Sequence, residues 1–198
     1  MTENTGAKKI DILRPTFLVI SGHSGAGKTT IREEITKLYP DAQFSLSMTT
    51  RLPRHEERDG TDYHFVGKDD FLQMIAREEL LEYEEVHGFY YGTPLKPVED
   101  ARKKPGLMIF DVDVKGGLSL KKRIPEALLV FIRPPDIEAL KNRLTARSTE
   151  DHEQIKRRLD RIPEEQKFAG LYDYVVTNDT VDVAVDEIAG IINDFQEK

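Results

Sequence analysis

The sequence predicts an α/β fold built on a central parallel sheet. Four short, mostly apolar segments have the length of buried strands, and they lie at residues 16–20, 107–110, 127–132 and 174–176. The segments between them carry apolar residues at helical spacing. Because strands that alternate with amphipathic helices usually pair in parallel, we expect a parallel sheet covered by helices.

The elements follow in order along the chain. Residues 1–14 are polar and predict a loose tail before the first strand, which runs into Ser21 and Gly22. Helices are expected where apolar residues share one face. These residues are Ile31, Ile35 and Leu38, then Ile137, Leu140 and Leu144, and finally Val181, Val185, Ile188, Ile192 and Phe195.

Two segments interrupt this alternation. Residues 45–95 are polar, aromatic and rich in turn residues, which predicts an inserted lobe of short strands with one helix near residues 69–79. Residues 143–160 are dense in charge and lie between two predicted helices. Ser148 has capping-box spacing for the second of these helices, and Pro163 is expected to break or kink it.

Composition narrows the functional classes. Of the 198 residues, 38% are hydrophobic and 33% charged, which is typical of a globular chain. Acidic residues outnumber basic residues by 36 to 29, and the net charge of −7 argues against nucleic-acid and anionic-membrane partners. The absence of cysteine excludes disulfides and a thiolate nucleophile. With no recognisable signal peptide and no apolar run near the roughly 18 residues that span a bilayer, we expect a cytoplasmic enzyme or interaction domain.

Residues 22–29, GHSGAGKT, match the phosphate-binding loop pattern G-x-x-x-x-G-K-[ST]. The glycines let backbone N–H groups curl around phosphate oxygens, and the following helix adds its positive N-terminus. Lys28 suits the β- and γ-phosphates, and the Thr29 hydroxyl suits Mg²⁺. Because the motif follows a predicted strand and opens a predicted helix, it predicts a nucleoside triphosphate site. The residues of this site are Gly22, His23, Ser24, Gly25, Ala26, Gly27, Lys28, Thr29 and Thr30.

Missing motifs narrow the class of P-loop protein. A GTPase would read guanine with Asn-Lys-x-Asp, which occurs nowhere in the chain, although residues 113–116 fit the short Asp-x-x-Gly pattern. Motors and helicases are larger. A small chain with two inserted polar segments is typical of a kinase for a small phosphorylated acceptor.

The acceptor side is marked by Arg51 and Arg54, which lie three residues apart in the segment SLSMTTRLPR. Paired guanidiniums suit a phosphate, and Tyr63 and Tyr91 can add neutral hydroxyl donors. Together with the phosphate loop, this segment closely resembles guanylate kinases, and the resemblance runs from about residue 17 to the C-terminus. The other matching motifs are LLEY at 80–83, FDVD at 110–113, IRPP at 132–135 and VTND at 176–179.

The resemblance implies a P-loop three-layer α/β/α domain that transfers the γ-phosphoryl group of ATP to GMP, giving ADP and GDP, in purine nucleotide metabolism. It also implies a single domain with three parts. These are a core (about residues 15–44, 96–135 and 169–198), a GMP-binding lobe (about 45–95) and a helical lid (about 136–168).

Eight positions match the GMP site of the family. The positions that hold the phosphate are Arg51, Arg54, Tyr63 and Tyr91. Glu82 matches the carboxylate that accepts from guanine N1–H and the 2-amino group. Ser47 and Thr93 match hydroxyls that donate toward O6 and N7, and Asp113 matches a second acidic contact.

The donor side is also implied by the resemblance. The residues expected to act in catalysis are Lys28, Arg51, Arg143, Arg147 and Arg158, of which the last three match lid arginines that close over the ATP phosphates. Asn178 lies where the adenine is contacted. Thr29 is expected to bind Mg²⁺ directly, and Asp111 to bind it through water.

The chain departs from the family pattern at several positions. His23 stands where proline is usual, and we expect its side chain to face outward with little effect. Glu56 replaces a common glycine and Lys115 a glutamine. Ala146 and Ser148 replace glycines beside Arg147, which is expected to restrict the lid.

Simpler interpretations exist for residues taken one at a time. Taken alone, Glu82 is typical of a solvated surface acid. Ser47 and Thr93 are typical of turn or cap residues, and Tyr63 and Tyr91 are typical of half-buried packing residues. Two other functions also stay open at this point. One is a P-loop kinase for a sugar phosphate, which should lack the guanine-reading residues. The other is a non-catalytic domain that binds phosphopeptides, which usually has a degraded phosphate loop.

Overall fold

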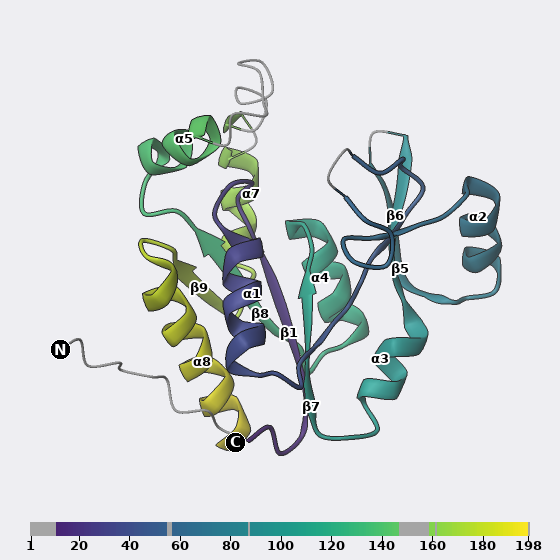
Figure 1. Ribbon diagram of the computed structural model, residues 1–198, viewed down its shortest axis with the longest axis horizontal. Helices are drawn as coiled ribbons and strands as arrows, with labels where there is room; N and C mark the ends of the chain where they lie inside the picture. The colour runs from purple at the N-terminus through teal and green to yellow at the C-terminus, as the bar shows by residue number, and fades with distance from the viewer. Residues whose placement is uncertain (1–10, 55–56, 87, 147–158, 161, 198) are drawn as a thin grey trace.

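A five-stranded sheet forms the centre of the computed structural model, which describes residues 11–54, 57–86, 88–146, 159–160 and 162–197 (Figure 1). In their order across the sheet, the strands are β2 (Gln43–Phe44), β7 (Gly106–Asp111), β1 (Pro15–Gly22), β8 (Leu128–Arg133) and β9 (Tyr174–Thr177). All neighbouring pairs are parallel, which confirms the predicted sheet. In the register, Val19 lies between Phe110 and Leu129.

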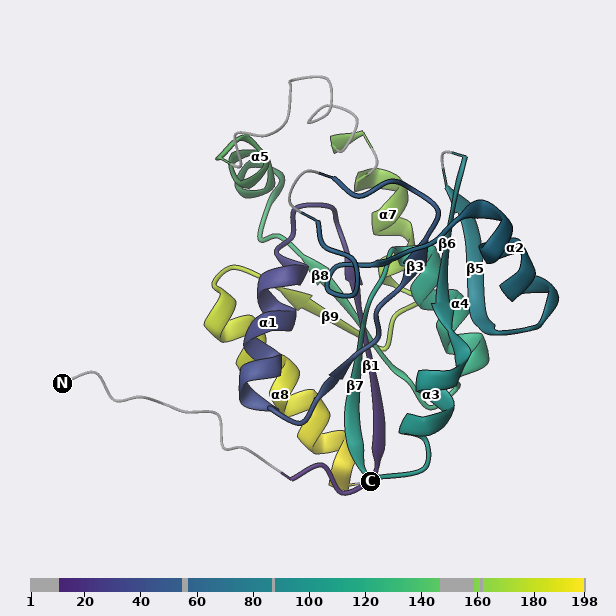
Figure 2. The same cartoon turned by 45° about the vertical axis from the view of Figure 1, so that its right-hand side comes forward.

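Helices cover both faces of this sheet and give three layers. Leu18 and Ile20 pack toward α1 and α8, which lie side by side on one face, whereas Phe17 and Val19 pack toward the opposite layer (Figures 1 and 2). This alternation follows from the two-residue period of a strand. The covering helices are α1 (Lys28–Leu38), α8 (Val181–Glu197), α3 (Leu95–Ala101), α4 (Val114–Arg123) and α7 (Ile162–Ala169).

Two of these helices, α3 and α4, were not predicted from the sequence. In α4 the buried face includes Gly116 and Gly117, so the apolar repeat is weak. The second glycine is required by packing, because a Cβ there would collide with the hydroxyl of Tyr172. In α3, Val98 is the buried residue, which is too little for a periodic pattern.

A second sheet lies beside the first and is formed by the segment that interrupts the alternation. Its order is β4 (His64–Phe65), β3 (Met48–Thr49), β6 (Phe89–Pro94) and β5 (Leu80–Val86). β5 and β6 are antiparallel, and their register is irregular between Leu80 and Glu82. The helix expected near 69–79 is α2 (Lys68–Ala76), which packs Phe71 into the interior.

The charged segment contributes α5 (Ile137–Ala146), where a helix was predicted. Pro163 is the second residue of α7, so it marks the start of that helix, where its missing N–H costs no hydrogen bond. Ser148 and the helix predicted after it lie outside the described residues. No helix in the described part of the chain is both long and apolar enough to cross a membrane.

Candidate active site

The phosphate loop forms the turn between β1 and α1, as predicted. Gly22 and Gly27 have φ angles of 136° and 90°, which favour glycine, and a Cβ at Gly22 would collide with the backbone of Ile132. Lys28 Nζ donates to the carbonyl oxygens of Gly22 and His23 at 3.0 Å each. The first N–H groups of α1 therefore open onto a loop whose shape is fixed by glycines and by this lysine.

The side chain of His23 points into the protein, so the expectation that it faces outward was wrong. The residue is 2% exposed. Its Nδ1 lies 3.1 Å from Oε2 of Glu165, and its Nε2 lies 2.9 Å from Oε1 of Gln166. The ring also packs edge-on against Phe131. The partners lie on α7, far along the chain, so the local motif carried no information on them.

Asn178 contacts the backbone of the phosphate loop. It is 2% exposed, and its Nδ2 donates to the carbonyl oxygen of Ala26 at 2.7 Å. A Cβ on Gly27 would collide with the same amide. Asn178 thus supports the phosphate loop in this structure, and the adenine contact that the resemblance implies remains a prediction.

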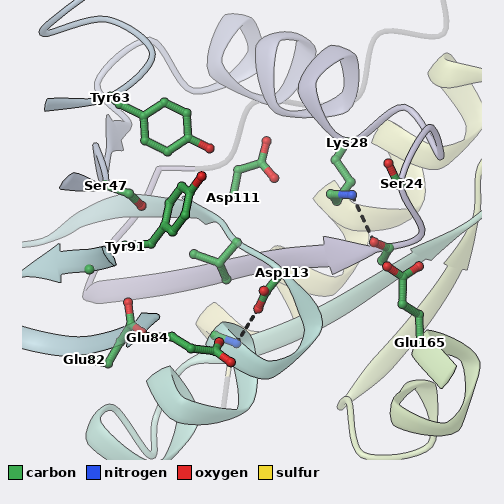
Figure 3. A pocket seen from close by; sticks show the side chains of 14 residues that line it. Ser24, Lys28, Ser47, Tyr63, Glu82, Glu84, Tyr91, Asp111, Asp113 and Glu165 are labelled. Atoms are coloured by element: carbon green, nitrogen blue, oxygen red, sulfur yellow. Dashed lines mark hydrogen bonds between the residues drawn. The ribbon is translucent and has the colours of Figure 1, made fainter. Parts of the chain in front are cut away.

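A cleft lies between the phosphate loop and the second sheet (Figure 3). One cavity of about 340 Å³ is lined from one side by Ser24 and Lys28, and from the other by Ser47 and residues of β5 and β6. A hollow of about 380 Å³ shares Ser24, Lys28, Ser47, Tyr63 and Asp111 with it. The two hollows are therefore parts of one cleft that joins the predicted donor and acceptor sides.

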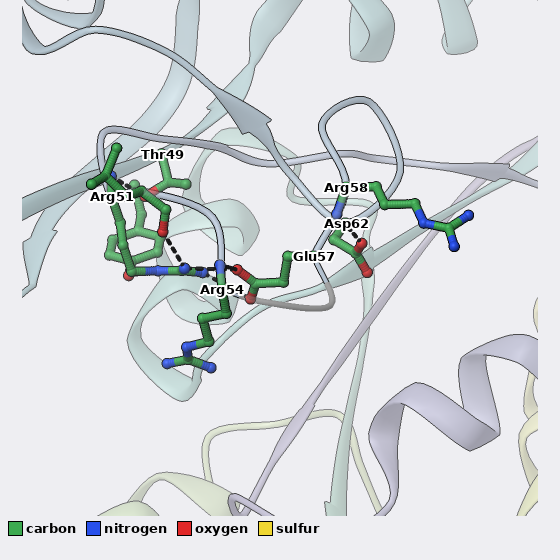
Figure 4. A network of polar contacts seen from close by, with 8 residues as sticks. Thr49, Arg51, Arg54, Glu57, Arg58 and Asp62 are labelled. Atoms are coloured by element: carbon green, nitrogen blue, oxygen red, sulfur yellow. Dashed lines mark hydrogen bonds and ion pairs between the residues drawn. The ribbon is translucent and has the colours of Figure 1, made fainter. Parts of the chain in front are cut away.

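Arg51 is held by a polar network (Figure 4), in which its partners Glu57 and Tyr91 line the cleft. Its guanidinium pairs with both carboxylate oxygens of Glu57, at 2.7 and 3.0 Å, and its Nε donates to the Tyr91 hydroxyl at 3.2 Å. The ion pair raises the pKa of Arg51 and holds that of Glu57 below its usual range. Glu57 also accepts from the backbone N–H of Arg54, whose guanidinium points away from the pair and lines the hollow.

The tyrosines expected at the acceptor phosphate lie together. The rings of Tyr63 and Tyr91 meet at 6.2 Å between centroids, and both hydroxyls point into the cavity (Figure 3). Burial raises the pKa of Tyr63, so its hydroxyl stays protonated and can donate.

Carboxylates gather at the far end of the cavity from the phosphate loop. Glu82 Oε1 accepts a 2.6 Å hydrogen bond from the hydroxyl of Thr93 on the paired strand. Burial raises the pKa of Glu82, and the Thr93 hydrogen bond opposes this shift. Asp113 lines the same end and caps α4 by accepting from the Gly116 N–H at 2.7 Å. Ser47 completes the wall.

Asp111 ends β7 between the two sides of the cleft. Burial raises its pKa, whereas the charges of Lys28 and Arg32 oppose this shift. Thr29 lines the same hollow. Mg²⁺ usually keeps several waters and takes one or two protein oxygens together with phosphates, so this hydroxyl and carboxylate fit such an ion. The described residues include no cluster of three or more side chains that would hold a metal alone.

Several predicted residues fall outside what the structure describes. Arg147 and Arg158, with the departures Glu56 and Ser148, lie in undescribed segments. Arg143 lies on α5, but its side chain is outside the description. The lid arginines therefore remain predictions.

Three acidic residues of the site were missed. Glu57 lies three residues after Arg54, and no sequence pattern marks it as a site residue. Its role becomes visible only in its ion pair with Arg51. Glu84 shares one face of β5 with Glu82 and lines the cavity, and strand alternation could have found it. Glu165 reaches the cavity from α7, and no local signal marks it.

These features define the class of protein. A phosphate loop on a parallel sheet faces a second sheet that carries an arginine, tyrosines and a half-buried carboxylate, which is the arrangement of a P-loop kinase with a phosphorylated acceptor.

Comparison with known proteins identifies the particular family. The family model for guanylate kinase matches residues 14–195. A guanylate kinase of Salinibacter ruber is 44% identical over 181 residues, covering 90% of this chain and 96% of the relative. One of Myxococcus xanthus is 43% identical over 177 residues, covering 89% and 85%. A crystal structure of guanylate kinase from Anaplasma phagocytophilum superposes with a TM-score of 0.74 at 26% identity, covering 96% of this chain and 90% of that one. The chain belongs to the guanylate kinase family.

Proposed function

We propose that the cleft between the phosphate loop and the second sheet is where the chain transfers the γ-phosphoryl group of ATP to GMP, giving ADP and GDP. The activity is that of the guanylate kinase family. The observation that carries the placement is one continuous cleft lined by Lys28 at one end and Glu82 at the other.

The acceptor assignment follows from chemistry along this cleft. A carboxylate on Glu82 accepts from the N1–H and the 2-amino group, two donors that guanine has and adenine lacks. The hydroxyl of Ser47 lines the same cavity, and that of Thr93 donates to Glu82 beside it. The phosphate of GMP would lie nearer the phosphate loop, against Tyr63, Tyr91 and the arginines. The lobe of residues 45–95 is then the GMP-binding part of the domain.

The donor assignment places the triphosphate of ATP on the loop of residues 22–30. Two unit charges 4 Å apart repel by about 4 kcal/mol at an effective dielectric of 20, so the meeting phosphates need cations. Lys28 supplies one and Arg54 lines the same hollow, whereas Arg51 is paired with Glu57, whose side chain lines that hollow. Bound at Thr29 and Asp111, Mg²⁺ would neutralise phosphate charge. No general base is needed, because the attacking phosphate oxygen is already ionised near neutral pH.

The rest of the residue assignment follows the resemblance. The lid of residues 136–168, with Arg143, Arg147 and Arg158, would close over the phosphates and exclude water. Asp113 would contact the nucleotide in addition to capping α4. We also place the chain in the cytoplasm, where its nucleotide substrates are made and used, with no nucleic-acid or membrane partner.

One assay tests this proposal. ADP release coupled to an optical readout is measured with GMP, dGMP, AMP, IMP and ribose 5-phosphate, for the wild type and Lys28→Ala. We expect GMP to be far above AMP and the variant to lose nearly all turnover. A folded wild type that binds ATP but releases no ADP with GMP would favour the phosphopeptide-binding alternative, and activity on ribose phosphate would favour the sugar-phosphate kinase.

A further inference from the structure

We propose that His23 is a positioning residue, which ties the phosphate loop to α7 and keeps the carboxylate of Glu165 from opposing the phosphates of ATP. This inference rests on the proposed function, because it concerns how the same loop receives its triphosphate.

The geometry gives His23 two partners on one helix. Its ring nitrogens lie 3.1 Å from Glu165 Oε2 and 2.9 Å from Gln166 Oε1. A carboxylate only accepts hydrogen bonds, so Nδ1 carries the hydrogen in the first contact. An amide offers both a donor and an acceptor, so Gln166 can satisfy Nε2 whether or not that atom is protonated. The ring therefore holds neighbouring residues of α7 against the loop.

The loop end of this contact bears directly on Lys28. The carbonyl oxygen of His23 accepts from Lys28 Nζ at 3.0 Å and from the Ala26 N–H at 3.0 Å. The ring is buried against Phe131 of β8, and turning it away would break both hydrogen bonds to α7 and this packing. A fixed ring thus fixes the carbonyl that positions the lysine of the phosphate site.

The α7 end of the contact concerns charge. The carboxylate of Glu165 lines the same cavity as Ser24 and Lys28, and it lies beside the loop in Figure 3. An acid at this place repels a triphosphate, and the attraction of Lys28 for it would compete with phosphate binding. The N–H of His23 offsets part of that charge and holds the carboxylate toward the ring. Loss of the N–H leaves an unneutralised acid in the donor site.

The charge argument predicts a rescue that a packing role does not. His23→Leu keeps an apolar side chain against Phe131 but removes both hydrogen bonds, and we expect KM for ATP to rise about tenfold with little change in KM for GMP. His23→Asn keeps an N–H near the place of Nδ1 and should lie close to the wild type. Glu165→Gln alone should lower KM for ATP about twofold, because the His23 N–H offsets only part of the acid's charge in the wild type. In the double variant with His23→Leu, Glu165→Gln should restore most of the ATP affinity.

Matched controls separate this effect from a general disturbance of α7. Glu164 is the adjacent acid, with 65% of its side chain exposed. Glu164→Gln combined with His23→Leu should give no rescue. Thermal unfolding of each variant shows whether the fold is intact.

The measurements are KM and kcat for both substrates, together with calorimetric binding of a non-hydrolysable ATP analogue without GMP. The binding measurement tests the inference even if the wild type does not phosphorylate GMP, so the two proposals fail separately. An unchanged ATP-analogue affinity in His23→Leu would overturn the inference. So would a double variant with Glu165→Gln that binds no better than His23→Leu alone.

Discussion

The hydroxyl of Thr93 donates to Oε1 of Glu82 at 2.6 Å, across the antiparallel pair of β5 and β6. The two residues lie opposite each other in the register, so the hydrogen bond orients the carboxylate toward the cavity without long side-chain reach. The remaining lone pairs of Glu82 stay available for a ligand with paired donors.

Base selection by Glu82 gives the first prediction. Glu82→Gln replaces an acceptor by an N–H, which faces one of the guanine donors, so kcat/KM for GMP should fall by about 10² or more. IMP has N1–H but no 2-amino group, so we expect the wild type to have a smaller kcat/KM for IMP than for GMP. Because IMP presents one donor fewer to Glu82, its kcat/KM should fall less than that of GMP in Glu82→Gln. The ratio of the two substrates is measured in wild type and variant. Equal losses would make Glu82 a structural residue.

The raised pKa of Glu82 gives a prediction on pH. Because burial moves this pKa upward, protonation begins at a higher pH than for an exposed glutamate. The protonated form loses acceptor capacity, so KM for GMP should rise as the pH falls from neutral toward acid. The phosphate of GMP also titrates and changes KM with pH. Glu82→Gln is the reference, because its KM still includes the titration of the phosphate but not that of residue 82. If the ratio of wild-type to Glu82→Gln KM is flat with pH, Glu82 does not titrate in binding.

The ion pair of Arg51 with Glu57 gives a prediction on stability. The folded pKa of Glu57 is lowered, so its contribution is present above the unfolded pKa and is lost as the pH falls through the folded pKa. Glu57→Gln should lower the free energy of unfolding by about 1–3 kcal/mol at pH 7, and the difference should vanish in acid.

Thermal or denaturant unfolding at several pH values measures this difference. Glu126→Gln is the matched control, because it disrupts an ion pair with Arg102 in which both side chains are more exposed. That control should cost less than about 1 kcal/mol. A loss of stability in Glu57→Gln that is the same at every pH would show that charge is not its cause.

The lid gives the last prediction, on a residue outside the described part of the chain. If Arg147 touches the transferring phosphoryl group as the resemblance implies, Arg147→Ala should lower kcat by about 10²-fold with little change in KM for GMP. Steady-state kinetics with both substrates tests it. An unchanged kcat would make the arginine a solvated surface residue. If lid motion limits turnover, Ser148→Gly should raise kcat or change KM for ATP.

The local elements were determined by the sequence alone. The strand before the phosphate loop, its glycine turn and its helix follow one another within residues 16–38, so each is visible in the chain. The parallel sheet was also predictable, because buried strands and amphipathic helices alternate. The helix α4 was not, because Gly117 is required by its contact with Tyr172, and that partner is distant in sequence.

The acceptor residues were recognised one by one through the family resemblance, but only the tertiary structure brings Ser47, Glu82 and Asp113 to one end of one cavity. It also decided the direction of the His23 ring, the pairing of Arg51 with Glu57 and the place of Glu165. The physical reason is that hydrophobic period, turn chemistry and loop motifs are local, whereas the direction and charge environment of a side chain depend on the residues that folding packs against it.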